Sequence, residues 1–220
     1  MALAQELIAF RAEYERTAPA ERIVLYNAKI EALQAAFPIA DVLAVGQPAP
    51  GFTLPSAKGC MVNLDERLNQ QHAVIVFYRG GWCPYCNLQL RAYQRLLPQL
   101  NELGATLVAI SPQLPDASLS TAERNALDFD VLSDVGNRVA RSFGLVYALP
   151  EAIREVLRSV GKALPDINGD DRWELPVPAT FVIAKGGQTV FSHADIDYRS
   201  RCEPDQVLAA LRALQAKTPL

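Results

Sequence analysis

Two cysteines three residues apart, in the motif Cys83-Pro-Tyr-Cys86, are the side chains of this chain best suited to chemistry. A continuous apolar, β-branched run at 73–78 precedes them and predicts a buried strand. Gly80-Gly81 is expected to end this strand. The cysteines therefore lie where a helix begins, and the positive end of a helix favours thiolate over thiol. The spacing places both sulfurs on one face of that helix. We expect a redox-active dithiol in which one thiol attacks an oxidant and the other resolves the product.

The same two cysteines supply half of a tetrahedral zinc site, which needs two further ligands. The remaining candidates stand isolated in the chain, without a second pair at ligand spacing: Cys60, His72, His193 and Cys202. A zinc site is therefore the less favoured hypothesis for this motif. We expect neither a metal nor another cofactor.

The overall composition is that of an ordinary globular protein. The chain has 220 residues, 50% of them hydrophobic, and a formal net charge of -3. No basic run suggests nucleic acid as a partner, and no apolar run is long enough to cross a membrane. The first residues lack the features of a secretory signal, so we expect a cytoplasmic protein, whose thiols rest in the reduced state.

Helical periodicity over 2–17 and 20–36 predicts an N-terminal helical hairpin. We expect this extension, residues 1–41, to pack on a main domain formed by residues 42–220. A homodimer contact is an alternative role for the hairpin.

The rest of the chain alternates strands with helices and predicts an α/β domain. A strand at 73–78, a helix at 84–101 and a strand at 105–110 form a right-handed βαβ unit with parallel strands. Pro98 is expected to kink or shorten that helix. The later elements are expected to be helices at 119–126, 136–143, 149–162 and 204–216, strands at 131–132, 179–184 and 188–192, and a loop at 164–174.

Several segments resemble peroxiredoxins of the alkyl hydroperoxide reductase/thiol-specific antioxidant superfamily: Gly46–Leu54, Val76–Cys86, Val131–Asp134 and Ala179–Ala184. The resemblance covers roughly residues 42–215 and implies a thioredoxin-like fold with peroxiredoxin-type extensions. It also implies a thiol-dependent oxidoreductase that acts on a peroxide or disulfide. A thioredoxin- or glutathione-type reductant would restore the thiols.

The chain departs from the family pattern at its central positions. In the family's Pro-x-x-x-Thr-x-x-Cys motif, Arg79 stands at the Pro position, Cys83 at the Thr position and Cys86 at the peroxidatic cysteine. Pro178 stands where the family has an arginine before a late strand. Cys-Pro-Tyr-Cys is the motif of glutaredoxins, and Val177-Pro178 resembles their Val–cis-Pro pair. This likeness predicts a cis bond that presents the Val177 backbone to an extended substrate.

Two assignments of the dithiol follow from these resemblances. In the thioredoxin-type assignment, which we favour, Cys83 attacks because a helix cap is more exposed than the first turn. In the peroxidatic assignment, Cys86 becomes a sulfenic acid and Cys83 condenses with it. The expected substrate-binding residues are Arg79, which could stabilise a thiolate, together with Trp82, Val177 and Pro178. The alternative function is a non-catalytic redox sensor or partner-binding module.

A polar cluster precedes the last predicted helix. We expect its members to cap that helix and carry surface charge: Asp195, Asp197, Tyr198, Arg199 and Arg201. Cys202, beside this cluster, is a weaker candidate for a remote resolving cysteine.

Overall fold

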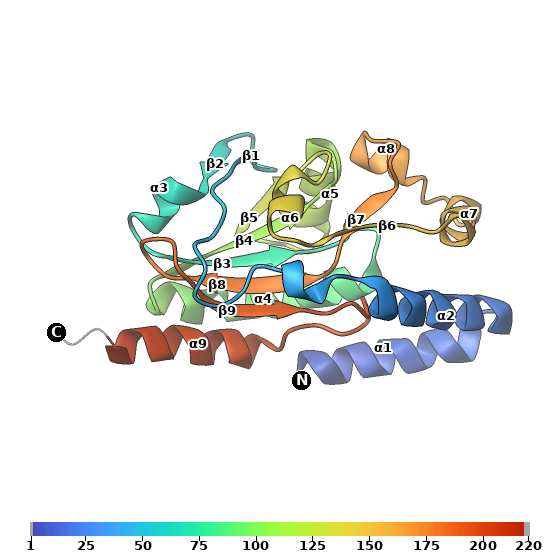
Figure 1. Ribbon diagram of the computed structural model, residues 1–220, viewed down its shortest axis with the longest axis horizontal. Helices are drawn as coiled ribbons and strands as arrows, with labels where there is room; N and C mark the ends of the chain where they lie inside the picture. The colour runs from blue at the N-terminus through green and yellow to red at the C-terminus, as the bar shows by residue number, and fades with distance from the viewer. Residues whose placement is uncertain (1, 218–220) are drawn as a thin grey trace.

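The computed structural model describes residues 2–217 and places a five-stranded sheet at the centre of the molecule (Figure 1). Residue 1 and residues 218–220, at the outer ends of the predicted hairpin and main domain, lie outside the described part of the chain. The strand order is β5-β4-β3-β8-β9, with β3, β4 and β5 parallel and the other pairings antiparallel. Their bounds are β3 His72–Phe77, β4 Ala105–Ser111, β5 Asp130–Ser133, β8 Ala179–Ile183 and β9 Thr189–Ala194. The predicted α/β class is confirmed.

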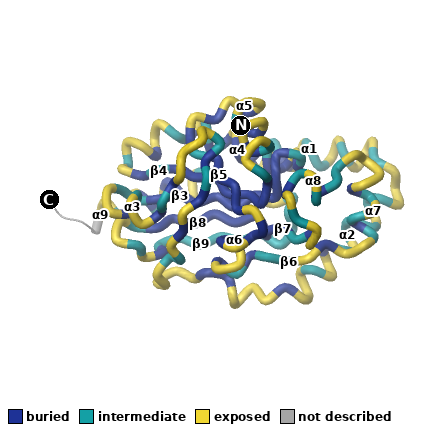
Figure 2. The backbone as a smooth tube through the Cα atoms, turned by 90° about the horizontal axis from the view of Figure 1, so that it is seen from above, coloured by how far each residue is buried: buried dark blue, intermediate teal, exposed yellow. Residues whose placement is uncertain are grey.

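The central strand β3 buries both of its faces, as its apolar sequence requires (Figure 2). Val74 and Val76 belong to one core cluster, while Ile75 and Phe77 belong to the other. Three helices contribute to the first cluster: α1 (Leu3–Thr17), α4 (Pro84–Glu102) and α9 (Pro204–Lys217). The second is built with β1 (Thr53–Pro55), β2 (Met61–Asn63), α3 (Leu64–Leu68) and α6 (Arg138–Ser142).

The two N-terminal helices form as predicted, and both run along the same end of the molecule (Figure 1). From α1, Leu3 and Leu7 enter the core cluster that contains α4, and Glu6 pairs with Arg95 at 2.7 Å. The second helix, α2 (Ala20–Ala36), leads through the short 3-10 helix η1 (Ile39–Asp41) towards the opposite face of the sheet. The first helix of the hairpin therefore packs against α4 of the sheet domain.

The predicted loop at 164–174 is wrong. It contains the helix α8 (Leu164–Asn168), with Pro165 in its first turn and Gly169 in the left-handed conformation at its end. It also contains the start of β7 (Glu174–Pro176), which pairs with β6 (Val146–Ala148). These short elements, together with α7 (Glu151–Ser159), enclose a third apolar cluster around Leu157 and Trp173.

Other boundaries differ modestly from the predictions. The helix α5 spans Pro115–Arg124, because Pro115 provides an earlier start than the predicted residue 119. The long helix α4 is not shortened and continues through Pro98 to Glu102.

The predicted cis bond at Val177-Pro178 is also wrong, since no peptide bond among the described residues is cis. Between β7 and β8, the backbone forms hydrogen bonds with residues next to β6 and β9. The Val177 N–H donates to the Leu145 carbonyl at 2.8 Å, and the Pro178 carbonyl accepts from the Asp195 N–H at 3.0 Å. A trans bond serves these contacts, and the Val177 amide is not available to a substrate.

The aromatic centre of the second core cluster provides a test of the fold. The fully buried Phe143 ring lies 4.9 Å from that of Phe77 and 5.2 Å from that of Phe181. Phe143→Ala should lower the free energy of unfolding by about 3–5 kcal/mol, because it leaves a cavity in a dense core. Leu119→Ala, on an exposed side chain, should change it by no more than about 0.5 kcal/mol. Urea denaturation measures both, and equal effects would contradict this packing.

Candidate active site

The dithiol lies at the junction between β3 and α4, where the sequence places it. Cys83 is the N-cap residue of α4, and Cys86 lies in the first turn, its N–H donating to the Cys83 carbonyl at 3.1 Å. Both thiols are free, and their residues are 1% and 0% exposed. The expectation that Cys83 is exposed is therefore wrong. The N-terminal helices and the segment around α7 cover the helix cap, a tertiary effect that the helix position alone does not reveal.

The loop before the dithiol is held in one conformation by close packing. Gly80 has φ +142, and a Cβ there would lie 2.4 Å from the Trp82 indole nitrogen. A Cβ on Gly81 would lie 2.1 Å from the Thr121 hydroxyl oxygen. The Gly81 N–H donates to Gln113 Oε1 at 2.7 Å, and its carbonyl accepts from Asn87 Nδ2 at 2.9 Å. Only glycine at both positions allows the loop to deliver Cys83 to its place.

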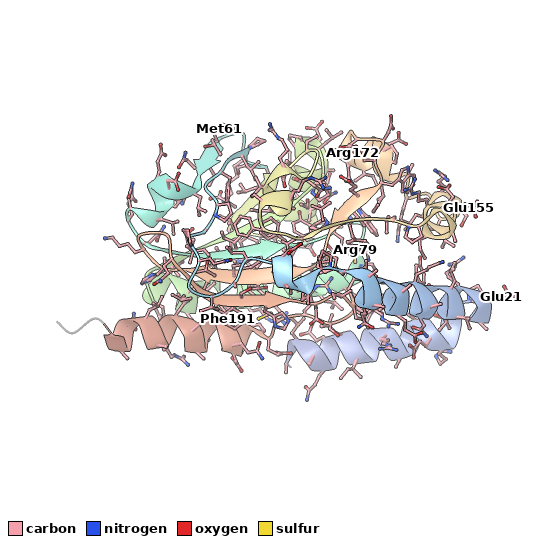
Figure 3. The ribbon with its side chains drawn as sticks, in the orientation of Figure 1. Glu21, Met61, Arg79, Glu155, Arg172 and Phe191 are labelled. Carbon is pink, nitrogen blue, oxygen red and sulfur yellow. The ribbon has the colours of Figure 1, made fainter. Side chains whose placement is uncertain are left out.

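Two buried arginines contact the two sulfurs. Arg79 Nη1 donates to Cys83 Sγ at 3.9 Å, a long and weak contact, and Arg201 Nη2 donates to Cys86 Sγ at 3.3 Å. Their residues are 4% and 7% exposed, and neither forms an ion pair with a described carboxylate. The Arg79 guanidinium lies instead over the Tyr198 ring, 4.0 Å from its centroid, and beside Trp82. Figure 3 shows Arg79 between the central sheet and α2.

These charges separate the pKa values of the two thiols. Burial raises the pKa of the Cys83 thiol, but the hydrogen bond with Cys86 and the charges of Arg79 and Arg201 outweigh it. The pKa of Cys83 therefore lies well below that of an ordinary cysteine. Burial, the same hydrogen bond and the negative charge of Cys83 hold the pKa of Cys86 well above the ordinary value. The pair is suited to one thiolate and one thiol, which is the arrangement that attack followed by resolution requires.

A pocket leads to the dithiol, and Cys83 lines it whereas Cys86 does not. Residues of α1 and α2 form one wall, and residues at the end of α7 form another. Arg79 and Trp82, both predicted to bind substrate, lie at the base beside Cys83. Val177 and Pro178 do not line this pocket, and Val177 belongs to the core cluster on the other face of the sheet.

Among the described residues, neither Cys60 nor Cys202 contacts a sulfur of the dithiol through a hydrogen bond or a disulfide. Cys60 is exposed, and Cys202 is buried, donating to the Glu203 carbonyl at 3.5 Å. Burial, above all, raises the pKa of Cys202 to about 12, so its thiol stays protonated at neutral pH. Within residues 2–217, no group of three or more His, Cys, Asp or Glu side chains is arranged to hold a metal ion. In the same part of the chain, no helix combines the length and apolarity needed to span a bilayer.

Sequence reasoning missed the role of Arg201 and Tyr198, which it assigned to capping and surface charge. Both reach the site from the segment before α9, and the Arg201 contact with Cys86 joins residues 115 positions apart. No local pattern marks such a contact. Gln113 was also missed, although its position just after β4, at the carboxyl edge of the parallel strands, is a usable signal.

The arginine contact predicts a change in pH dependence. Arg79→Gln should raise the pKa of Cys83, because it removes a positive charge that favours the thiolate. The rate of alkylation by iodoacetamide falls as the pH drops through this pKa. The variant should therefore lose reactivity at a higher pH than the parent chain.

The exposed Lys185, in the turn between β8 and β9, supplies the matched control. Lys185→Gln removes the same charge and should leave the alkylation profile in place. An Arg79→Gln profile that coincides with that of the parent chain would contradict the role of Arg79.

Comparison with known proteins places this geometry in a family. The model of the AhpC/TSA family matches residues 45–191, more than half of the chain. Peroxiredoxin Bcp of Escherichia coli (strain K12) is 31% identical over 103 residues, which are 47% of this chain and 65% of that protein. The chain thus matches somewhat less than two thirds of this curated relative's length.

Solved structures agree on the fold. The peroxidoxin BcpB of Mycobacterium tuberculosis superposes with a TM-score of 0.62 at 23% identity, covering 78% of this chain and 98% of that one. The AhpC protein of Mycobacterium tuberculosis also gives 0.62, at 17% identity, covering 81% and 97%. The prediction of a peroxiredoxin-like protein on a thioredoxin-like fold is confirmed. The chain belongs to the AhpC/TSA family.

Proposed function

We propose that this protein is a thiol peroxidase in which Cys83 attacks the peroxide and Cys86 resolves the product. The observation that carries the proposal is the position of Cys83, the only sulfur of the pair that lines the pocket. Its lowered pKa supports the same assignment, because the thiolate is the nucleophile. Cys83 thus remains the proposed attacking thiol, although it is buried, because it lines the pocket and has a lowered pKa.

The proposed reaction balances within the dithiol. The Cys83 thiolate attacks the outer oxygen of the peroxide, the O–O bond breaks, and the alcohol leaves after taking a proton from solvent. Cys83 is now a sulfenic acid. The Cys86 thiol attacks its sulfur, a disulfide forms and water leaves. Two thiols are oxidised to a disulfide, and one peroxide is reduced to an alcohol and water.

The charged surroundings support both steps. The donors of Arg79, beside Cys83, are placed to stabilise the oxygen that becomes negative as the O–O bond breaks. Arg201, beside Cys86, favours the developing thiolate of that residue during resolution. Pro178 stands where the family has an arginine that helps to bind the peroxide. We propose that Arg79 and Arg201 together take the place of that arginine.

The disulfide then needs an external reductant of the thioredoxin or glutathione type. We propose the cytoplasm as the compartment, because such reductants keep thiols reduced there. The Escherichia coli relative is named as a peroxiredoxin, which supports a peroxide as the substrate. A homodimer formed through the N-terminal helices remains a proposal. Ile8 and Val24 on these helices are 67% and 68% exposed.

Disulfide exchange is the second candidate for the same dithiol. The Cys-Pro-Tyr-Cys motif and the pocket at Cys83 favour it, since a small disulfide could also be attacked by the Cys83 thiolate. Turnover of a peroxide and of a small disulfide, each with thioredoxin and with glutathione, separates the two. Turnover of neither would leave the non-catalytic sensor as the function.

Single-cysteine variants test the assignment of roles. Cys86→Ser should still consume one equivalent of peroxide and stop at a Cys83 sulfenic acid, which a cyclic diketone traps for mass spectrometry. Cys83→Ser should lose peroxide consumption to background, because the remaining thiol has a raised pKa and does not face the pocket. Cys60→Ser, which changes an exposed thiol, is the control. Sulfenic acid on Cys86 in the Cys83→Ser variant would reverse the assignment.

A further inference from the structure

We propose that a second pocket, between α2 and the segment from β6 into α7, binds a small carboxylate with an apolar body and thereby lowers the reactivity of Cys83. The pocket at Cys83 and this second pocket share Arg79, which donates to the Cys83 sulfur. Cys83 does not line the second pocket, so the ligand there is an effector and is not oxidised or reduced. This regulation goes beyond the proposed function, because it acts on the thiolate whatever oxidant the thiolate meets.

The second pocket has apolar walls. The helix α2 contributes Ile30 and Leu33, and the segment from β6 into α7 contributes Leu149 and Ile153. The whole of the α2 wall precedes residue 45, where the family match begins. A hydrocarbon chain gains free energy when it leaves water for walls of this kind. The walls therefore suit the apolar body of the ligand.

A pair of tyrosine rings separates the two pockets. Tyr26 and Tyr198 line both, and their rings meet edge to face with centroids 6.4 Å apart. Arg79 also lines both, with its guanidinium 4.0 Å from the centroid of the Tyr198 ring. A charge bound in the second pocket would therefore act on the guanidinium that favours the Cys83 thiolate.

The charged side chains of the second pocket are positive. Arg79 and Lys29 line it, whereas no acidic side chain of residues 2–217 does. Neither cation forms an ion pair within the same residues. Arg79 is 4% exposed, and its Nε has no hydrogen-bond partner in the described part of the chain. A cation in such surroundings attracts anions strongly, and a singly charged carboxylate costs less to bury than a phosphate.

The other titratable groups near Cys83 do not neutralise Arg79. Burial raises the pKa of the Cys86 thiol and of four surrounding tyrosines, Tyr26, Tyr85, Tyr147 and Tyr198. All five groups are therefore neutral near pH 7, and the Cys83 thiolate is the anion beside Arg79 and Arg201. A carboxylate in the second pocket would add a negative charge next to Arg79. The thiolate would then be less stabilised, and the pKa of Cys83 would rise.

Hexanoate and hexanamide are matched probes of this effect, because they share the apolar body and differ in charge. With the full chain, hexanoate should move the pH profile of Cys83 alkylation by iodoacetamide to higher pH and leave the plateau rate unchanged. Hexanamide should leave the whole profile in place. Profiles that coincide with and without hexanoate would overturn the inference. Equal slowing at every pH would also overturn it, because hexanoate would then obstruct the pocket at Cys83.

Two alanines of α2 locate the effect. Ala28 and Ala32 are both exposed and lie one helical turn apart, but only Ala32 lines the second pocket. Ala32→Trp should obstruct the pocket and abolish the shift that hexanoate causes, whereas Ala28→Trp should keep it. A shift that persists in Ala32→Trp would refute the location.

Lys29 tests the recognition of the carboxylate. Lys29→Gln should weaken the binding of hexanoate about three- to tenfold, as expected for the loss of one partly exposed charge contact. Lys185→Gln, in the turn between β8 and β9, is the matched control and should keep the parent affinity. Equal losses in the two variants would contradict a role for Lys29.

A binding measurement separates this inference from the proposed function. Coupling between two sites is reciprocal, so hexanoate should bind more tightly when the thiolate is absent. By calorimetry at pH 7, we expect Cys83→Ser to bind hexanoate about fivefold more tightly than the parent chain, and Cys60→Ser to bind it equally. Equal affinity in Cys83→Ser would refute the coupling. Peroxide turnover without coupling would refute this inference alone, and coupling without turnover would refute the proposed function alone.

Discussion

The contact between two buried arginines and two buried thiols is the constraint around which this structure is organised. A buried cation without a carboxylate is costly, and here the charge of the Cys83 thiolate and the face of the Tyr198 ring offset that cost. The arginines come from opposite ends of the domain, Arg79 after β3 and Arg201 before α9. Because these segments are distant in the sequence, the chemistry of the dithiol depends on the tertiary fold rather than on the motif alone.

The N-terminal hairpin converts this charged site into an enclosed one. A cysteine at the start of a helix is expected to be exposed to solvent. In this chain, residues of α1 and α2 lie over the N-terminus of α4 and separate Cys83 from the solvent. With them, Cys83 is almost wholly buried and its surroundings have a lower dielectric constant than water, which strengthens each electrostatic contact. The hairpin thus affects the reactivity of the thiols as well as the stability of the domain, although it lies outside the family match.

The sequence predicted what depends on neighbours along the chain. The strand-turn-helix around Cys83 and Cys86 was predictable because hydrophobic periodicity, the glycine pair and a proline at the helix start all agree. The burial of Cys83 and the contact of Arg201 with Cys86 were not predictable, since each depends on segments far apart in the chain. The Val177-Pro178 bond was predicted wrongly because the likeness to glutaredoxins covers two residues, whereas the hydrogen bonds of β7 and β8 decide the conformation.

The same arginines have a further consequence once the dithiol is oxidised. A disulfide between Cys83 and Cys86 carries no charge, so Arg79 and Arg201 would lose the anion that stabilises them in the interior. The reduced form is thereby favoured over the oxidised form, which raises the reduction potential of the couple. The disulfide of such a couple is readily reduced, even by weak reductants. The charge arrangement that activates the thiolate therefore also promotes its regeneration.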